Sequence, residues 1–453
     1  MATETSAAAA VPSGRTWLQR WEPEDEDFWK QTGSRLAWRT LWITTANLIM
    51  AFIVWFAVSA LVVRLPGIGF KLTGTQLFWL AAMPGLAGGT LRIIHTFLVP
   101  IYGTRHVVAF STLSLLIPAV GWFYVVQDPT TPYWILMTLA FLAGLGGGNF
   151  SSFMPSTSLF FPKRLQGTAL AIQAGIGNFG VSVVQFVTPW VIGFVLVGTL
   201  AGEPQTFTRA GTQSPIWLQN ATLIYIPFIA VFGVMAWFML RSVPVRANFR
   251  EQADIFTKKH AFFMTLLYIM TFGSFSGLSA TFPLLIRQIF GGFPGAPDPL
   301  AFAFLGPLVG SVIRVLAGPV SDRLGGARVT HWSGIGLVAC AIAVTFFTTP
   351  TSMADFPYFV GAMLGLFLFA GIGNASTFKQ MPMLFPPRQA GGVIGWTGAM
   401  AAYGPFACGL MLGYSFDWFG TFNVFFYVTA AFYAACTAIN WWFYARKGAE
   451  APC

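Results

Sequence analysis

Long apolar stretches recur along the whole chain and are separated by short polar connectors. A helix that spans a lipid bilayer needs about 20 predominantly apolar residues. These stretches reach that length, and none shows the period-2 alternation typical of barrel strands. We therefore expect twelve transmembrane helices, at residues 38–62, 74–101, 105–126, 132–159, 167–199, 217–240, 260–288, 299–320, 329–348, 355–383, 391–415 and 420–444.

The composition agrees with an all-α membrane protein. Hydrophobic residues make up 55% of the chain and charged residues only 9%, whereas soluble domains are about a quarter charged. The formal net charge is +10, but the basic residues form short clusters between apolar stretches, which argues against a nucleic-acid partner. The four cysteines have no metal-ligand or disulfide spacing, so we expect no metal and no cofactor.

The distribution of basic residues predicts how the chain sits in the membrane. If the N-terminus is cytoplasmic, 18 of the 25 Lys and Arg residues fall on the cytoplasmic side, 4 fall on the other side and 3 lie within helices. Cytoplasmic loops carry such an excess of positive charge. We therefore expect a multi-pass protein of the bacterial inner membrane, in contact with lipid, with both termini in the cytoplasm.

These patterns divide the chain into five segments. Trp21 and Trp29 lie in an acidic and then basic stretch, which we expect to run along the membrane surface. The basic stretch before the seventh helix is the predicted linker between halves. The segments are a cytoplasmic tail with this interfacial stretch (1–35), an N-terminal six-helix half (36–241), a cytoplasmic linker (242–259), a C-terminal six-helix half (260–446) and a cytoplasmic tail (447–453).

An internal repeat relates the two halves. Residues 159–180 align without gaps to residues 383–404, with identical residues at five positions that include Phe161/Phe385 and Gly180/Gly404. GGTLR, ending at Arg92, likewise matches GSVIR, ending at Arg314, and GGGNFSSF (146–153) matches GIGNASTF (371–378). Three matches in the same order indicate duplication, and parallel repeats are an established transporter architecture with the binding site between the halves.

Arg92 and Arg314 are the most informative residues, because each lies within a predicted membrane helix. An arginine there costs roughly 2.5–3.5 kcal/mol on insertion scales. All fifteen Asp and Glu residues fall in predicted loops, tails or helix ends, so no carboxylate can neutralise either guanidinium at mid-membrane. The repeat places both arginines on one cavity. We therefore predict a binding site for a small oxyanion; satisfaction of both arginines by carbonyls and water alone is the alternative.

Further polar residues extend this hypothesis. Asn178 either reaches an oxyanion in the cavity or forms an interhelical hydrogen bond, and Tyr268 either lines the cavity or simply packs. Lys379 lies close to a predicted helix end, so we expect its amine to extend to the cytoplasmic interface. Three residues of the loop after the eighth helix are predicted to form a cytoplasmic gate: Asp322, Arg323 and Arg328.

Several motifs resemble a known transporter family. GPVSDRLGGAR (318–328) resembles the GxxxDRxGxR loop of the major facilitator superfamily, with one extra residue. GTALAIQAGIGNFGVSVVQ (167–185) resembles the nitrate signature of the NarK-type nitrate/nitrite porters of that superfamily. WEPEDEDFW, FFPKRLQG and LLYIMTFGSFSG are similar to that family too. The resemblance implies the major facilitator fold, with twelve helices in two pseudo-symmetric halves, and transport of nitrate and nitrite by alternating access.

The resemblance also implies roles for individual residues. Nitrate would be held by Arg92 and Arg314, with Asn178 and Tyr268 as further hydrogen-bonding partners. Phe150 and Phe272 would form aromatic walls on either side of the planar anion. We find no nucleophile–base pair or metal constellation at membrane depth, so we expect a transporter rather than an enzyme. We also expect the protein to function as a monomer.

The coupling mode has two alternatives. Nitrate uptake opposes an inside-negative potential, so it needs a driving partner. Exchange for nitrite needs no titratable group, because two unscreened guanidiniums resist closure of an empty carrier. Proton symport needs such a group, and His95, one helical turn from Arg92, is the candidate. We favour nitrate/nitrite antiport, with nitrate/proton symport or transport of another small oxyanion as the alternatives.

Overall fold

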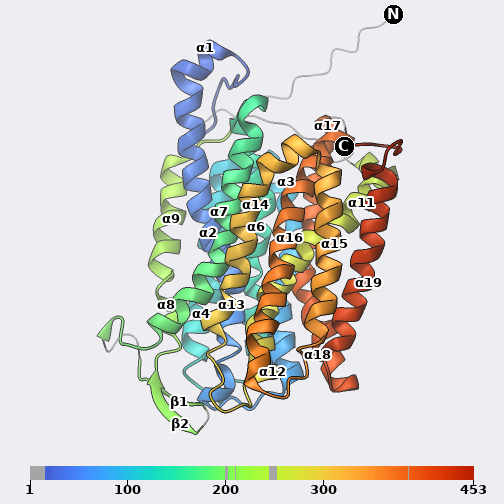
Figure 1. Ribbon diagram of the computed structural model, residues 1–453. Coiled ribbons are helices and arrows are strands. Elements are labelled where there is room, and N and C mark those ends of the chain that lie inside the picture. The colour runs from blue at the N-terminus through green and yellow to red at the C-terminus, as the bar shows by residue number, and fades with distance from the viewer. Residues whose placement is uncertain (1–15, 199–201, 210, 244–252, 386) are drawn as a thin grey trace, which may run out of the picture.

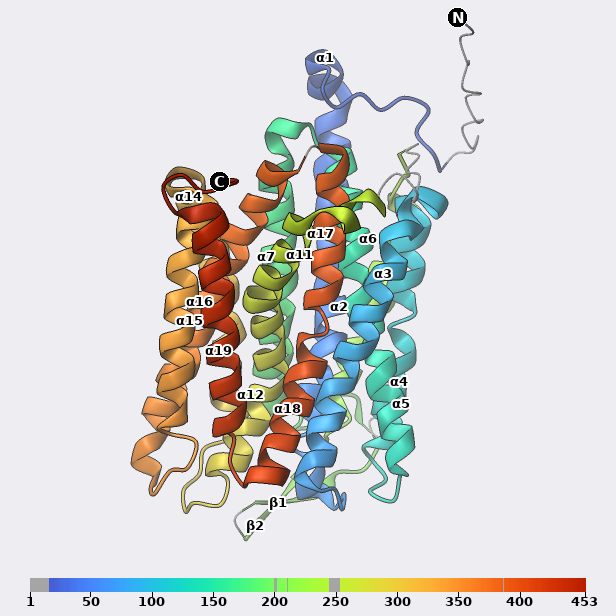
Figure 2. The same cartoon turned by 90° about the vertical axis from the view of Figure 1, so that its right-hand side faces the viewer.

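The computed structural model describes residues 16–198, 202–209, 211–243, 253–385 and 387–453. Its helices run side by side as a bundle (Figures 1 and 2). Helix α1 and the C-terminus lie at one end, which we call the terminal face, and a β-hairpin lies at the other, which we call the hairpin face. Among the described residues, eleven helices are long and apolar enough to cross a membrane on their own.

The N-terminal half contains the first six predicted crossings. Its elements are α1 (Glu26–Phe28), the π-helical turn η1 (Trp29–Gly33), α2 (Ser34–Leu61), η2 (Leu65–Ile68), α3 (Gly74–Leu113), α4 (Leu116–Val125), α5 (Tyr133–Ala143), α6 (Leu145–Phe160), α7 (Lys163–Val191), β1 (Gln205–Arg209), β2 (Thr212–Ile216), α8 (Asn220–Leu223) and α9 (Ile226–Met239). The second and third crossings share α3, which turns sharply at Gly103. Its φ of 78° is one that glycine adopts without strain.

The C-terminal half contains the remaining six predicted crossings. Its elements are η4 (Ala253–Thr257), α11 (Lys259–Tyr268), the π-helical turn η5 (Ile269–Gly273), α12 (Ser274–Phe290), α13 (Leu300–Ala303), α14 (Leu305–Leu324), α15 (Gly326–Thr345), η6 (Met353–Asp355), α16 (Phe356–Leu384), α17 (Pro387–Ala401), α18 (Gly404–Phe419), α19 (Asn423–Asn440) and η7 (Trp441–Ala445). Of the predicted linker 242–259, residues 244–252 lie outside the described residues, as do residues 1–15 of the predicted tail.

The eleventh predicted helix, 391–415, is broken. It consists of α17 and α18, which are 15 and 16 residues long and meet at Ala402–Tyr403. Pro405 follows directly and has no amide hydrogen to donate to the turn before it, so the helical hydrogen-bond ladder is interrupted here. This break explains why eleven rather than twelve helices are long enough to span alone.

The two halves meet through two equivalent pairs of helices. α3 packs against α18, and α14 packs against α7. In crossing order these pairs are the second with the eleventh and the eighth with the fifth. A two-fold axis that exchanges the halves converts one pair into the other, so the contacts agree with the predicted duplication. The arginines of the sequence motif lie on α3 and α14, at this interface.

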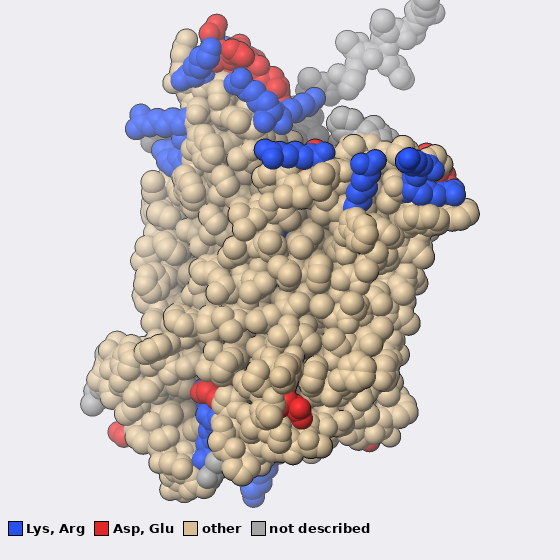
Figure 3. Space-filling model, in the orientation of Figure 1, with Lys and Arg blue, Asp and Glu red and all other residues tan. Residues whose placement is uncertain are grey.

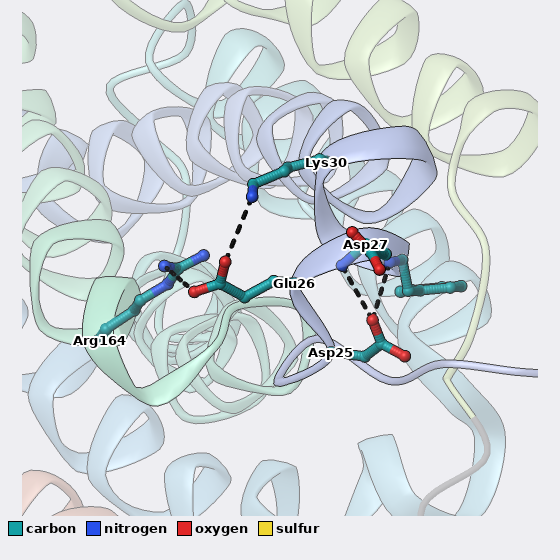
Figure 4. A network of polar contacts seen from close by, with 6 residues as sticks. Asp25, Glu26, Asp27, Lys30 and Arg164 are labelled. Atoms are coloured by element: carbon teal, nitrogen blue, oxygen red, sulfur yellow. Dashed lines mark hydrogen bonds and ion pairs between the residues drawn. The ribbon is translucent and has the colours of Figure 1, made fainter.

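The segment before α2 contacts α6 and α7, and its location along the membrane surface stays a prediction. Residues 26–61 form one continuous helical span. Trp29 is buried, and the Trp21 indole donates to the Leu159 carbonyl at 3.0 Å. Figure 4 shows the polar part of this contact, in which Glu26 pairs with Lys30 at 3.2 Å and with Arg164, on α7, at 3.5 Å. The tryptophans are therefore used for packing.

Charge is unevenly distributed over the surface. Figure 3 shows Lys and Arg gathered at the terminal face, few at the hairpin face, and a broad uncharged belt between them. The C-terminal tail also docks at the terminal face, where the Glu450 carboxylate contacts the Lys259 amine at 2.5 Å. The hydrogen bond from Lys259 lowers the pKa of Glu450 below its ordinary value. The arrangement matches the excess of positive charge predicted for one side of the membrane.

A short antiparallel hairpin, which the hydropathy pattern did not predict, closes the hairpin face. In β1 and β2, Gln205 pairs with Ile216 and Arg209 with Thr212. The Arg209 guanidinium lies 3.9 Å from the Asp298 carboxylate, which belongs to the other half. Asp298 also forms an ion pair with Arg64, whose side chain is only 6% exposed. One carboxylate of the C-terminal half thus binds two cations of the N-terminal half.

This carboxylate makes a testable contribution to stability. In Asp298→Asn, the nearly buried Arg64 loses its counter-charge, and we expect a loss of about 2 kcal/mol, because Asp298 is itself partly exposed. The apparent melting temperature of the detergent-purified protein should fall by several degrees. Asp128→Asn is the control, because the exposed Asp128 bonds only within its own turn. Equal melting temperatures for both variants would contradict the expectation.

Candidate functional site

Arg92 is held by backbone carbonyls of both halves. Its side chain is fully buried on α3. Nε donates to the Gly147 carbonyl on α6 at 2.9 Å, and Nη1 donates to the Gly398 carbonyl on α17 at 2.8 Å. Nη2 has no hydrogen-bond partner among the described residues. Neutral carbonyls orient this guanidinium but leave its full positive charge in place, with one nitrogen free to donate.

Aromatic faces surround the same guanidinium. The Arg92 Cζ lies 4.6 Å from the ring centroid of Phe150 and 5.2 Å from those of Trp55 and Phe272. Such contacts stabilise a cation through the ring quadrupole, most strongly where water is excluded. Phe150 and Phe272 come from opposite halves, so the rings enclose Arg92 at the interface. The arrangement lowers the cost of the buried charge without neutralising it.

Arg314 is the corresponding residue of the second half. It is buried on α14, its Cζ lies 5.3 Å from the Phe378 ring, and its Nη1 has no hydrogen-bond partner among the described residues. The two guanidiniums are close enough to repel each other, and both interact electrostatically with Tyr268. None of the ion pairs found in the described part of the chain includes either arginine. A bound anion would relieve this repulsion.

The predicted aromatic walls face each other. The rings of Phe150 and Phe272 are nearly parallel, with an angle of 25° and centroids 6.4 Å apart. Carbon atoms in contact lie about 3.5–4.0 Å apart, so a flat guest between two rings needs roughly 7 Å. Phe272 lies in the π-helical turn η5, a distortion that is frequent at functional sites. The pair can therefore enclose a flat, small ligand after a slight separation.

Tyr268 and Asn178 complete the set predicted to bind substrate. The Tyr268 ring stacks on Phe272 at 5.4 Å, and its buried hydroxyl interacts with the Arg314 guanidinium without forming a geometrically complete hydrogen bond. Asn178 is fully buried on α7, and both polar atoms of its amide are unpartnered among those residues. The interhelical hydrogen bond considered as its alternative role is therefore not formed. Buried polar groups rarely lack partners, so the Asn178 amide has the capacity to bind a ligand or water.

His95, the predicted coupling residue, lies beside this set. Its ring is almost fully buried, and Nδ1 lies 3.0 Å from the Ser152 hydroxyl on α6. Arg92 contacts α6 as well, through Gly147, so both residues face the same helix as expected from their spacing. The contact places a titratable ring one turn from the arginine, with a neutral hydroxyl as its partner.

The predicted gate residues lie at the terminal face, away from the arginines. Asp322 forms an ion pair with Lys379 of the neighbouring helix α16, with Nζ and Oδ1 2.6 Å apart. Both side chains are partly exposed, as expected for a lysine that extends toward the interface. Arg323 and Arg328 are exposed, and neither forms a described ion pair with Asp322. The contact of Asp322 is therefore with a neighbouring helix.

The structure adds contacts that sequence reasoning missed. Trp55 and Phe378 pack on the two arginines, but aromatic residues make up 17% of the chain, so no single one stands out. The roles of the Gly147 and Gly398 carbonyls could not be predicted from residue type, because every residue has a backbone carbonyl.

The chain is similar to known transporters along nearly its whole length. A family model described as the Major Facilitator Superfamily matches residues 46–378. The chain is 66% identical to the probable nitrate/nitrite antiporter NarK2 of Thermus thermophilus, over 97% of the chain and 98% of that protein. It is 37% identical to the nitrate/nitrite transporter NarU of Escherichia coli, over 96% of the chain and 97% of that protein. It is also 24% identical to the nitrite extrusion protein of Bacillus subtilis, over 89% and 93%.

These matches extend over nearly the whole length of the chain and of its relatives. The fold predicted from the apolar stretches and from the resemblance, an all-α membrane protein of the major facilitator type, is confirmed. The protein is a membrane transporter and not an enzyme. It belongs to the NarK-type nitrate/nitrite porter family of the major facilitator superfamily.

Proposed function

We propose that this protein carries nitrate and nitrite across the bacterial inner membrane by alternating access, and that it exchanges one anion for the other. The observation that carries the proposal is the pair of buried guanidiniums, Arg92 and Arg314, with no carboxylate partner among the described residues. Two relatives, 66% identical from Thermus thermophilus and 37% identical from Escherichia coli, are named for the transport of these two anions.

The chemistry of the site suits a small planar oxyanion. Arg92 Nη2 and Arg314 Nη1 are unpartnered donors, and a guanidinium binds oxyanions through directed N–H groups. Phe150 and Phe272 favour a flat guest, because their rings are nearly parallel and only 6.4 Å apart. Nitrate and nitrite are flat and carry a single charge. A tetrahedral phosphate or a bulky carboxylate would need a wider space between the rings.

Exchange follows from the same unscreened charges. Nitrate entry against an inside-negative potential costs about 2.3 kcal/mol per 100 mV, so uptake without a coupled partner is unfavourable. When the site is empty, closure around Arg92 and Arg314 brings two like charges together without an anion between them. Loaded carriers would therefore change conformation more readily than empty ones. Nitrate/proton symport through His95 is the second candidate, because that ring lies one turn from Arg92.

The proposed orientation places both termini in the cytoplasm. The terminal face carries most of the Lys and Arg residues visible in Figure 3, as the positive-inside rule requires of a cytoplasmic face. The hairpin and the ion pairs of Asp298 would then face the periplasm. Each chain contains both arginines and both aromatic walls, so one chain supplies a whole site and we propose that the monomer is the functional unit.

A counter-ion experiment in proteoliposomes tests exchange. We expect rapid nitrate uptake into vesicles loaded with nitrite, and little uptake into vesicles without an internal anion, whether or not a pH gradient is imposed. Uptake is followed with labelled nitrate, and protein-free vesicles give the leak. Strong uptake into empty vesicles driven by a pH gradient would contradict antiport and favour symport; His95→Phe should then abolish it.

Conservative substitution of the arginines tests direct binding. Arg92→Lys and Arg314→Lys keep the charge but remove the planar arrangement of N–H donors, so we expect nitrate affinity to fall roughly tenfold or more. Affinity is measured by calorimetric titration of the purified carrier. Arg35→Lys, at an exposed arginine of α2, is the matched control and should bind as the unmodified protein does. Undiminished affinity in both site variants would refute direct contact with the anion.

A further inference from the structure

Asn374, on α16, has an unexplained polar side chain. It is fully buried, and neither its amide nitrogen nor its amide oxygen has a hydrogen-bond partner among the described residues. A buried polar group left unpaired loses its hydration without compensation, and such groups are few in native structures. The amide therefore needs a partner that is not part of the described chain.

The neighbours of Asn374 along α16 show which way it faces. Three residues earlier, the backbone of Gly371 approaches α14 so closely that a Cβ there would lie 2.4 Å from the Gly310 carbonyl. Four residues later, Phe378 lies 5.3 Å from the Arg314 guanidinium and 5.0 Å from the Tyr268 ring. Residues three and four apart share one face of a helix. Asn374 thus lies at the edge of the stripe that faces α14 and Arg314.

Contacts on the other faces of α16 further define the direction in which the Asn374 side chain points. Ser376 bonds to Thr330 on α15 at 2.7 Å, and this face points away from the interface of the halves. Thr377 lies 3.5 Å from Thr271 in the turn η5, beside the residues that stack on Phe272. Asn374 lies on the side of α16 between these two faces: one contacts α14, and the other contacts η5. That side is directed toward the candidate site.

Ser311 adds a second unexplained group at the same place. It precedes Arg314 by three residues on α14, so both lie on one face of that helix. Its side chain is buried, and its hydroxyl has no hydrogen-bond partner among the described residues. Ser311 therefore lies one turn before Arg314 on α14 itself, and Asn374 lies on the neighbouring helix α16, which packs against α14. Both carry a neutral donor without a partner among the described residues, as does Nη1 of Arg314.

The repeat provides a comparison within the chain. Asn149 is the counterpart of Asn374 in the motifs GGGNFSSF and GIGNASTF. The Asn149 amide donates across to the Ser111 carbonyl of α3, at 3.5 Å, and so joins two helices of its own half. Asn374 makes no such bond. The amide nitrogen of Asn149 thus has a partner and only its amide oxygen lacks one, whereas both polar atoms of Asn374 lack a partner among the described residues.

We propose that Asn374 is a substrate-contacting residue, whose amide N–H donates to an oxygen of the anion held by Arg314, with the Ser311 hydroxyl beside it. This inference rests on the proposed function as an anion carrier and extends its site to α16. A neutral amide suits the position, because it adds a directed donor without changing the site's charge. A cationic side chain there would add its own repulsion with Arg92 and Arg314. An anionic side chain would neutralise Arg314 in place of the substrate.

Binding measurements on three variants test this proposal. Nitrate affinity is obtained by calorimetric titration, and the melting temperature of each purified variant is measured with and without nitrate. For Asn374→Ala, we expect the nitrate Kd to rise roughly tenfold, because one hydrogen bond to a charged ligand is lost. Asn149→Ala is the matched control and should keep the Kd of the unmodified protein, even if it melts at a lower temperature.

Asn374→Asp separates a binding role from a structural one. Its carboxylate has nearly the same shape as the amide but supplies Arg314 with a permanent counter-charge. We expect this variant to melt, without nitrate, at least as high as the unmodified protein and to gain no stabilisation from nitrate. Unchanged nitrate Kd in both Asn374 variants would overturn the inference. Absence of nitrate binding by the unmodified protein would instead overturn the proposed function.

Discussion

Two positive charges in an apolar interior determine the design of this transporter. Arg92 and Arg314 are buried where the described chain offers no carboxylate, so their charge is met by carbonyl oxygens and aromatic faces. Such neutral groups reduce the energy of a buried cation but cannot cancel it. The centre of the protein therefore carries positive charge that no described side chain neutralises. In the proposed function a bound anion supplies the missing negative charge, which would link substrate binding to conformational change.

The position of Arg92 links that deficit to the movement of the halves. Its guanidinium bonds to Gly147 of one half and to Gly398 of the other, and rings from both halves cover it. Any rearrangement that separates the halves at this level must break the bond to Gly398 and expose the charge. Substrate can replace that bond with its own oxygens. The helix that carries Gly398 ends in a break before Pro405, which gives this wall of the site a natural point of flexure.

The sequence allowed the crossings, the repeat and the arginine pair to be predicted, because each rests on a strong and local signal. Apolar length defines a membrane helix, and the inventory of carboxylates leaves the arginines unpaired. Other features depend on tertiary contacts that a single chain does not reveal. The break at Ala402–Tyr403 was not predicted, although Gly404 and Pro405 follow it directly, because the apolar stretch around them is long enough for one helix. The hairpin lies in a connector without marked alternation. Asn374 became informative only when its lack of partners was visible.

The ion pairs of Asp298 have a consequence for the order in which the protein is built. Arg64 and Arg209 are synthesised and inserted with the first half, whereas their common counter-charge is 234 residues away from Arg64. Until the second half enters the membrane, the carboxylate that pairs with both cations in the described structure is not yet in place. Domain docking is then favoured electrostatically from the hairpin face inward. Asp298, which is synthesised after both arginines, therefore forms its ion pairs only when the two halves associate correctly.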